Sequence, residues 1–389
     1  MKKGWLLFSL LAIVSLFLPA CAAVSSSGVI KIGAIGELTG SEAALGASFK
    51  NAADLAVKKV NDSGGLEVGG KKYKILLTML DNASMVGRSA ALVYKLYEQN
   101  NVVAIIGPNA DRFAIPASES AERIEISLIT PRSTNPKTTL DTLTGQPKKY
   151  VFRACLSDAG QGSLLARFAL EKLGAKKAAA LYDAQADYNR AIAESFKQTF
   201  EAGGGQMVAF ETYASGDKHF SDQLTEIKAA NPDLVLLPND YSDIPLQVQQ
   251  AHILGITAPF LGSDSWANTE LLRRCGMDCE GSYFSTHFST EDPSPVTQEF
   301  VAAYTAQYES PPDETAALTD DAFNLLWRAL QAAGVADRQA VRDALAKISQ
   351  FQGVTGSIQF QPGSGDPLKS ASIMQIKNGI FTFFATANP

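Results

Sequence analysis

Short β-forming runs alternate with helical patterns along most of this chain, and this alternation restricts the fold more than any other feature of the sequence. Strand-like runs rich in β-branched and other apolar residues occupy 29–35, 73–80, 102–106 and 127–130. Apolar side chains recur at helical spacing in the segments between them, at 43–61, 84–99 and 111–123. Strands and helices that alternate in this way form a mainly parallel sheet with helices on both faces. The sequence therefore predicts an α/β fold.

The pattern restarts after a turn-rich segment at 131–149, which we interpret as the boundary between two domains. A second set of strands is predicted at 150–155, 178–182, 206–211 and 234–237, with helices from Asp158 and at 188–202, 220–230 and 244–254. Further helices are predicted at 295–308, 314–333 and 337–348, before a β-rich tail at 355–385. Two doubly wound lobes place the carboxyl ends of their strands at a common cleft. Backbone N–H groups and helix N-termini point into such a cleft, so we expect the ligand there.

The first twenty residues have the features of an export signal and stand apart from the fold. Lys2 and Lys3 give a short positive segment, and an apolar run follows at 5–18. A run of about fourteen residues is shorter than the roughly twenty that a membrane-spanning helix needs. We predict that residues 1–20 are a signal peptide, and no second long apolar run follows in the sequence.

The tetrapeptide LPAC at 18–21 resembles a bacterial lipobox, in which cleavage leaves an acylated cysteine at the N-terminus. We predict that Cys21 carries acyl chains that hold the protein at a membrane. Small and polar residues at 22–28 would then form a flexible tether. The alternative is an ordinary signal peptide cleaved near Ala23. The predicted location is the periplasm or the cell surface.

Length and charge limit the classes of protein that remain. About 360 residues follow the signal, enough for two domains. Without Lys2 and Lys3, the 34 Lys and Arg residues fall to 32 against 40 Asp and Glu, a net charge of −8. This balance argues against nucleic acid or anionic lipid as the main partner.

Three cysteines remain besides Cys21. Export permits a disulfide, and Cys275 and Cys279 are the natural pair because they enclose a tight loop through Gly276. The alternative is that both stay as free thiols, and the sequence assigns no role to Cys155. No His lies close to the pair in sequence, so we predict no metal site there.

Seven segments together resemble the branched-chain-amino-acid-type solute-binding proteins of ABC importers, which have the type I periplasmic binding fold. The segments, in order along the chain, are IKIGAIGELTG at 30–40, DNAS at 81–84, VAIIGP at 103–108, PAS at 116–118, LITPRSTNP at 128–136, FRACLSDAGQG at 152–162 and FLGSDSWAN at 260–268. The resemblance implies a hinge of three crossing strands. It also implies that 29–152 and 286–350 form one lobe, and that 153–285 and 351–389 form the other.

The family holds the carboxylate of an amino acid with hydroxyl and backbone groups and its ammonium with an acid. By resemblance, Ser133 and Thr134, after the Thr-Pro turn, would bind the carboxylate; alternatively they cap the turn. Asp264 matches the acid that binds the ammonium; it could also cap the following helix, and the two roles are compatible.

Two residues depart from the family pattern near the carboxylate site. Asp111 stands where a hydroxyl is usual, and a carboxylate there would repel the carboxylate of a ligand. Either Asp111 turns away as a helix cap, or the ligand presents a cation or an N–H donor. Arg132 replaces a small residue, and it would either neutralise Asp111 or clamp an anionic group.

Aromatic residues are expected to form walls of the site. Tyr188 falls where the family often places an aromatic over the ligand, Tyr241 follows Asp240 in a loop after a strand, and Trp266 follows the predicted ammonium site. Such walls suit an apolar or cationic ligand body, although packing within a lobe is the alternative for each. If Leu45 lines the site, that wall is aliphatic.

No pattern in the sequence supports an enzyme. There is no GxSxG or HExxH motif, and His219, His252 and His287 are isolated, as surface or packing residues are. The segment GLEVGGKK at 65–72 resembles a phosphate loop, but it follows a helix and precedes a strand, the reverse of the required order. We interpret it as a helix end followed by a β-turn, and we expect no cofactor.

The sequence thus favours a monomeric solute receptor whose partners are a small ligand and an ABC permease. The expected ligand is an amino acid or a related nitrogen-containing metabolite, such as an amide or a cationic derivative. Two alternatives remain: a sensory lipoprotein whose closed state is recognised by a signalling partner, and an extracytoplasmic hydrolase.

Overall fold

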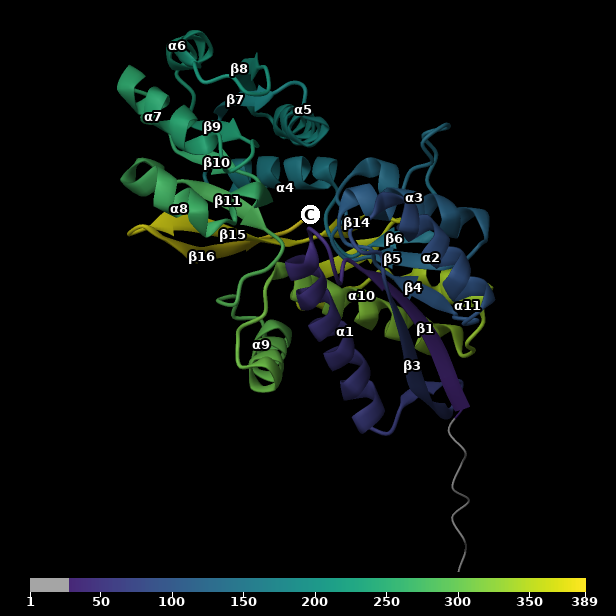
Figure 1. Cartoon of the computed structure of the whole chain (residues 1–389). Coiled ribbons are helices and arrows are strands. Elements are labelled where there is room, and N and C mark those ends of the chain that lie inside the picture. The colour runs from purple at the N-terminus through teal and green to yellow at the C-terminus, as the bar shows by residue number, and fades with distance from the viewer. Residues whose placement is uncertain (1–27) are drawn as a thin grey trace, which may run out of the picture.

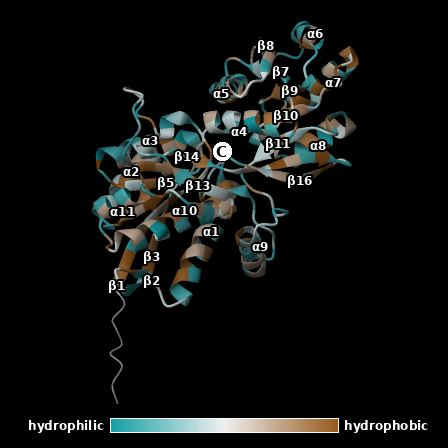
Figure 2. Cartoon of the chain, turned by 180° about the vertical axis from the view of Figure 1, so that it is seen from behind, coloured by the Kyte–Doolittle hydropathy of each residue, from teal (hydrophilic) through white to brown (hydrophobic). Residues whose placement is uncertain are grey.

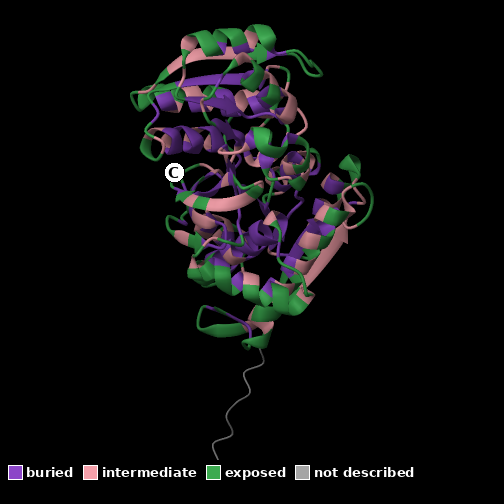
Figure 3. Ribbon diagram, turned by 90° about the vertical axis from the view of Figure 1, so that its left-hand side faces the viewer, coloured by how far each residue is buried: buried purple, intermediate pink, exposed green. Residues whose placement is uncertain are grey.

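The computed structural model describes residues 28–389; the predicted signal peptide and the lipidation at Cys21 lie outside these residues. The chain forms two lobes, each built on its own sheet (Figure 1). Buried residues gather at the centre of each lobe (Figure 3). The predicted fold class, two α/β lobes with mainly parallel sheets, is confirmed.

The first lobe contains a six-stranded sheet of order β2-β3-β1-β4-β5-β6. Its strands are β1 (Gly28–Gly36), β2 (Leu66–Val68), β3 (Lys71–Asp81), β4 (Ala104–Ile106), β5 (Ser127–Thr130) and β6 (Val151–Arg153). All pair in parallel except the β2–β3 hairpin. Gly69 and Gly70 form its turn with positive φ, a conformation that glycine adopts without strain. The segment that resembled a phosphate loop is therefore a hairpin.

Helices cover both faces of this sheet and bury apolar residues against it; Figure 2 shows apolar and polar residues mixed along them. On one face the core joins strand residues to α1 (Ala43–Asp62), α10 (Glu314–Ala333) and α11 (Arg338–Leu345). On the other face lie α2 (Val86–Glu98) and α3 (Asp111–Arg123). The helix α9 (Pro295–Tyr308) packs beside α1 through Phe300 and Ala52.

The second lobe contains a seven-stranded sheet of order β16-β15-β11-β10-β9-β7-β8. Its strands are β7 (Lys177–Asp183), β8 (Gln206–Tyr213), β9 (Leu234–Leu237), β10 (Phe260–Gly262), β11 (Tyr283–Thr286), β15 (Ala371–Lys377) and β16 (Ile380–Ala387). The helices α4 (Asp158–Glu171) and α5 (Asp187–Ala202) cover one face. The other face is covered by α6 (Ser221–Ala230), α7 (Ile244–Leu254) and α8 (Thr269–Cys275).

The C-terminal region is divided between the lobes, which differs from the division predicted from the sequence. The small antiparallel sheet of β12 (Phe351–Gly353), β13 (Gly356–Phe360) and β14 (Pro367–Lys369) packs on the first lobe. Ile358 and Phe360 on β13 enter the first core because they alternate with outward-facing residues along the strand. Only β15 and β16 join the second sheet, where they appear as the yellow hairpin in Figure 1.

The chain crosses between the lobes three times, after β6, after β11 and between β14 and β15. Parallel strands of both sheets therefore end near these crossings, and the loops that follow them face the space between the lobes. In residues 28–389, no helix has the length and apolar character needed to cross a membrane.

Candidate ligand-binding site

A cavity of about 440 Å³ lies between the lobes, and both contribute to its walls. The first lobe supplies Ala110, Asp111, Arg132 and Thr134, which follow β4 and β5. The second lobe supplies Tyr188, Asp240, Tyr241, Asp264, Ser265, Ala267 and Asn268. Seven of the residues predicted from the sequence thus meet in one place: Asp111, Arg132, Thr134, Tyr188, Asp240, Tyr241 and Asp264.

Ser133 is not among the lining residues, because it is buried behind the wall of the first lobe. Its hydroxyl donates to Oδ1 of Asp111 at 2.6 Å, and the backbone N–H of Asn135 donates to the same oxygen at 3.2 Å. Asp111 is the first residue of α3, and Ala110 takes the cap position. The carboxylate of Asp111 therefore fixes the loop after β5 while it also lines the cavity.

One of the two roles predicted for Arg132 was to neutralise Asp111. In the structure Arg132 pairs with Glu314 instead. Its Nε lies 3.4 Å from Oε1 of Glu314, at the start of α10. Burial alone would lower the pKa of Arg132, but the charges of Glu314 and then Asp264 raise it. Arg132 therefore stays cationic between carboxylates of the two lobes.

Asp264 is oriented by several groups of the second lobe. The Tyr188 hydroxyl donates to Oδ1 of Asp264, and the backbone N–H of Asp264 donates to Oε1 of Gln161 at 3.1 Å. Burial, followed by the charge of Asp264, raises the pKa of Tyr188 well above its usual value. Tyr188 is thus a neutral donor, and it holds Asp264 at the cavity wall.

His287 and Glu314 belong to this site although the sequence did not single them out as ligand residues. His287 is buried, and its Nε2 accepts the backbone N–H of Leu156 at 3.1 Å. Its Nδ1 lies 3.5 Å from Oδ2 of Asp264 and 3.6 Å from Oε2 of Glu314. Burial would raise the pKa of Glu314, but His287 and Arg132 hold it well below its usual range. Glu314 is therefore ionised.

The side chains of Asp264, His287 and Glu314 offer atoms within 4.8 Å of one another, a set that could hold a metal ion. The protonation of the His287 imidazole argues against a metal ion. A neutral imidazole has one N–H and one lone pair. The lone pair on Nε2 accepts the Leu156 N–H, so Nδ1 carries the proton, and it lies 3.5 Å and 3.6 Å from the two carboxylates without a hydrogen bond to either. In this arrangement Nδ1 has no lone pair for a metal.

Asp158 lies behind the same wall, at the start of α4. Its backbone N–H donates to the carbonyl of Thr134 at 3.1 Å, and its side chain is buried with Oδ1 unpartnered among the described residues. Burial raises the pKa of Asp158 to about 7; a hydrogen bond from Thr134 opposes this, and the charges of Asp111 and Asp264 add to it.

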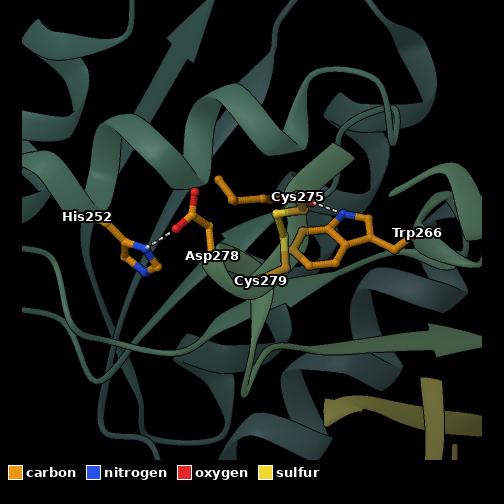
Figure 4. Close-up of a disulfide and its surroundings, with 6 residues drawn as sticks. His252, Trp266, Cys275, Asp278 and Cys279 are labelled. Atoms are coloured by element: carbon orange, nitrogen blue, oxygen red, sulfur yellow. Dashed lines mark hydrogen bonds and ion pairs between the residues drawn. A yellow bond between two sulfur atoms is a disulfide. The ribbon is translucent and has the colours of Figure 1, made fainter. Parts of the chain in front are cut away.

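The prediction that Trp266 lines the ligand site is wrong. Trp266 is fully buried in the core of the second lobe, where its Nε1 donates to the carbonyl of Leu237 at 3.1 Å. Figure 4 shows its ring beside the disulfide that joins Cys275 and Cys279, whose Cα atoms lie 5.7 Å apart. The side chain turns inward because the short helix Asp264–Trp266 places Asp264 and Trp266 on different sides.

A second cavity of about 520 Å³ adjoins the first and shares Arg132, Asp264 and Ala267 with it. Its apolar walls come from Leu45, Phe284, Phe288, Met374 and Phe381. Leu45 thus lines this adjoining space and not the first cavity.

Two α/β lobes with three crossings and a polar cavity between them define a solute receptor that encloses its ligand. Residues 29–380 match the family described as "Periplasmic binding protein", and the chain belongs to this family. It is an extracytoplasmic substrate-binding protein of an ABC transporter, of the branched-chain-amino-acid type.

Individual relatives agree with this assignment. The chain is 30% identical to the Leu/Ile/Val-binding protein BraC3 of Rhizobium johnstonii over 85% of this chain and 87% of the relative. It resembles the leucine-binding protein structure from Thermotoga maritima, with a TM-score of 0.69, 32% identity and coverage of 92% and 99%. It also resembles the branched-chain amino acid binding protein of Streptococcus pneumoniae in complex with isoleucine, with a TM-score of 0.68, 32% identity and coverage of 93% and 99%.

Proposed function

We propose that this receptor binds an amino acid, or a close relative with a free ammonium group, in the cavity between its lobes and delivers it to an ABC permease. The observation that carries the proposal is the arrangement of Asp264. Its carboxylate lines the cavity and is oriented by the hydroxyl of Tyr188, and Nδ1 of His287 lies 3.5 Å from its Oδ2. A pre-oriented carboxylate binds an ammonium with little further ordering.

Arg132 provides the opposite charge for a carboxylate on the ligand. It is the one Lys or Arg among the residues that line the first cavity, and its one ion pair in the described part of the chain is with Glu314. A guanidinium can bind a carboxylate with two parallel N–H bonds. An ammonium at Asp264 and a carboxylate at Arg132 together fit the backbone of an amino acid.

Closure of the lobes on the ligand would produce the state that the permease recognises. Each lobe contributes charged groups to the cavity, so a ligand that bridges them favours the closed arrangement over the open one. The ligand leaves unchanged, and the protein acts as a monomer.

Calorimetry with a panel of amino acids tests this proposal. At least one amino acid should bind, and Asp264→Asn should weaken binding at least tenfold, whereas Asp222→Asn, an equal change of charge on α6, should not. Binding at a hundredfold excess over Kd stabilises the folded state by about 2.7 kcal/mol, which a thermal-shift measurement detects. Absence of binding across the panel contradicts the proposal. Chemical conversion of the ligand during incubation would show that the protein is an enzyme and that the ligand does not leave unchanged.

We further propose that Cys21 is acylated and anchors the receptor to a membrane. The lipobox-like tetrapeptide at 18–21 and the apolar run before it support this. The protein from membranes should gain the mass of the acyl chains on an N-terminal peptide that begins at Cys21. Cys21→Ser should release it to the soluble fraction; a soluble wild-type protein without added mass would rule out the anchor.

A further inference from the structure

We infer that the ligand carries a second cationic nitrogen, which faces Asp111 on the wall of the first lobe, so that the preferred ligands are basic amino acids. This inference rests on the proposed function and names the class of amino acid. It follows from three features of the cavity: the direction of the hydroxyl protons, the balance of charge, and the position of Asp111 relative to Asp264.

The hydroxyl groups near the loop after β5 have their protons engaged by protein acceptors. Ser133 donates to Asp111 at 2.6 Å, and Thr130 donates to the carbonyl of Pro108 at 2.7 Å. A hydrogen bond from Thr134 acts on the carboxyl of Asp158. Ser133 and Thr130 are buried behind the wall, so Thr134 is the one of these hydroxyls that lines the cavity. A hydroxyl whose proton is engaged offers a ligand a lone pair, which binds an N–H group and is unfavourable for a carboxylate.

Asp111 itself retains an unused acceptor. Its Oδ1 accepts from Ser133 and Asn135, and its neighbour Arg112 pairs with Glu42 instead. No ion pair to Asp111 occurs among residues 28–389, although its side chain lines the cavity. A carboxylate that is held in place by two donors and lacks a cation is prepared for one from the ligand.

The charges of the cavity do not balance for a ligand with a neutral side chain. Asp111, Asp240 and Asp264 line it with Arg132 as the one cation, and Arg132 is already shared with Glu314. Three further cations lie in the adjacent segments, and none of them lines the cavity. Arg153 donates to the carbonyls of Ser133 and Asn135 behind the wall and pairs with Asp366. Lys137 and Arg190 pair with Asp187.

The buried carboxyl of Asp158 lies behind the same wall, and its Oδ1 has no partner among the described residues. A zwitterion with no further charge would leave the cavity net negative on closure, which low dielectric makes costly. A second cation on the ligand reduces this cost.

The two acids lie on opposite lobes, which sets the shape of the ligand. Asp264 belongs to the second lobe and Asp111 to the first, and both face the same cavity. A ligand with its α-ammonium at Asp264 and its side-chain nitrogen at Asp111 spans the cleft. Such a ligand draws the lobes together through both of its cations, with its carboxylate at Arg132.

Calorimetry with L-lysine, L-ornithine, L-arginine, L-glutamine and L-leucine tests the inference on the full mature chain. The wild-type protein should bind at least one basic amino acid tenfold or more tighter than L-glutamine and L-leucine. Asp111→Asn keeps an oxygen for Ser133 and Asn135, and it should weaken that basic ligand at least tenfold with little effect on L-glutamine. Asp62→Asn, an equal change of charge at the far end of α1, should have no such effect.

The outcomes separate the inference from the proposed function. Equal or tighter binding of L-leucine or L-glutamine overturns the second cation but leaves an amino acid receptor. Tight binding of a basic amino acid that is unaffected by Asp111→Asn overturns the role of Asp111. If no amino acid of the panel or the remaining standard set binds, both fail. Circular dichroism of each variant shows that a loss of binding is not a loss of folding.

Discussion

The backbone N–H of Leu156 donates to Nε2 of His287 at 3.1 Å, and this bond connects two of the three segments that cross between the lobes. Leu156 follows β6, and His287 follows β11. The bond fixes which nitrogen of the imidazole carries the proton. That proton then faces Asp264 of the second lobe and Glu314 of the first, so the hinge and the ligand site share one side chain.

The tautomer of His287 is directly measurable. In ¹⁵N-labelled protein at pH 8, the long-range couplings of the buried histidine should show a proton on Nδ1 and none on Nε2, because Leu156 occupies the Nε2 lone pair. Assignment uses the spectrum of His287→Gln, from which these signals should be missing. A proton on Nε2 would contradict the arrangement and would make Nδ1 available to a metal.

Asp158 should make stability depend on pH. Its pKa is raised by burial to about 7, so between about pH 4 and pH 7 the folded state holds a proton that the unfolded chain has lost. Stability therefore falls as pH rises through this window. Asp158→Asn removes the effect, and its stability relative to wild type should increase by about 2–3 kcal/mol between pH 5 and pH 8. Urea unfolding at both values measures this.

The control for this experiment is Asp222→Asn, an equal change of charge at an exposed position on α6. A constant difference for Asp158→Asn would show that Asp158 is ionised throughout.

Trp266 and Tyr188 should respond to substitution in opposite ways. Trp266→Phe removes the donor to the Leu237 carbonyl and leaves a void in the core, so it should lower the free energy of unfolding by about 1–3 kcal/mol without changing affinity. Tyr188→Phe removes the donor that orients Asp264, so it should weaken amino acid binding about tenfold. If Trp266→Phe folds stably but loses affinity, Trp266 contributes to the ligand site and its assignment to the core alone is wrong.

Gly162 lies in α4 at a tight contact with α5. A Cβ at this position would lie 2.3 Å from the carbonyl oxygen of Ile192, so Gly162→Ala must push the helices apart and should cost about 1–3 kcal/mol of stability. Gly87 in α2 is the matched control, because a Cβ there meets no atom within 4 Å. Gly87→Ala should be neutral or stabilising by up to about 1 kcal/mol. Similar unfolding midpoints for both variants would refute the close contact.

Much of the fold was predictable because strong local patterns set the elements. The strand predicted at 127–130 is β5, and the helices predicted at 244–254 and 314–333 are α7 and α10, with the same bounds. Local patterns do not state which sheet a strand joins. The tail after residue 355 was predicted as one β-rich unit, yet β13 and β14 pack on the first lobe and β15 and β16 on the second. That choice depends on apolar surfaces remote in sequence.

The site was predictable where it depends on loops that follow strands. Asp111, Thr134 and Asp264 face the cavity because the strands before them end there. The direction of each side chain was not predictable. Ser133 turns inward to Asp111, and this depends on contacts that adjacent residues in the sequence do not reveal.

The remote partners were missed for a related reason. Glu314 opens a helix almost two hundred residues away from Arg132, and no local pattern marks it or His287 as ligand residues. Only the return of α10 to the first lobe brings Glu314 to the cleft.

The divided tail has a consequence for biogenesis. The first lobe needs β13 to complete its core, and the second needs β15 to join β11 to β16. The chain emerges from the ribosome or the translocation channel with its N-terminus first. Neither lobe can therefore be completed until residues 351–387 have emerged. The nascent receptor stays incomplete throughout its passage, and both halves of the binding cleft become available together at the end of it.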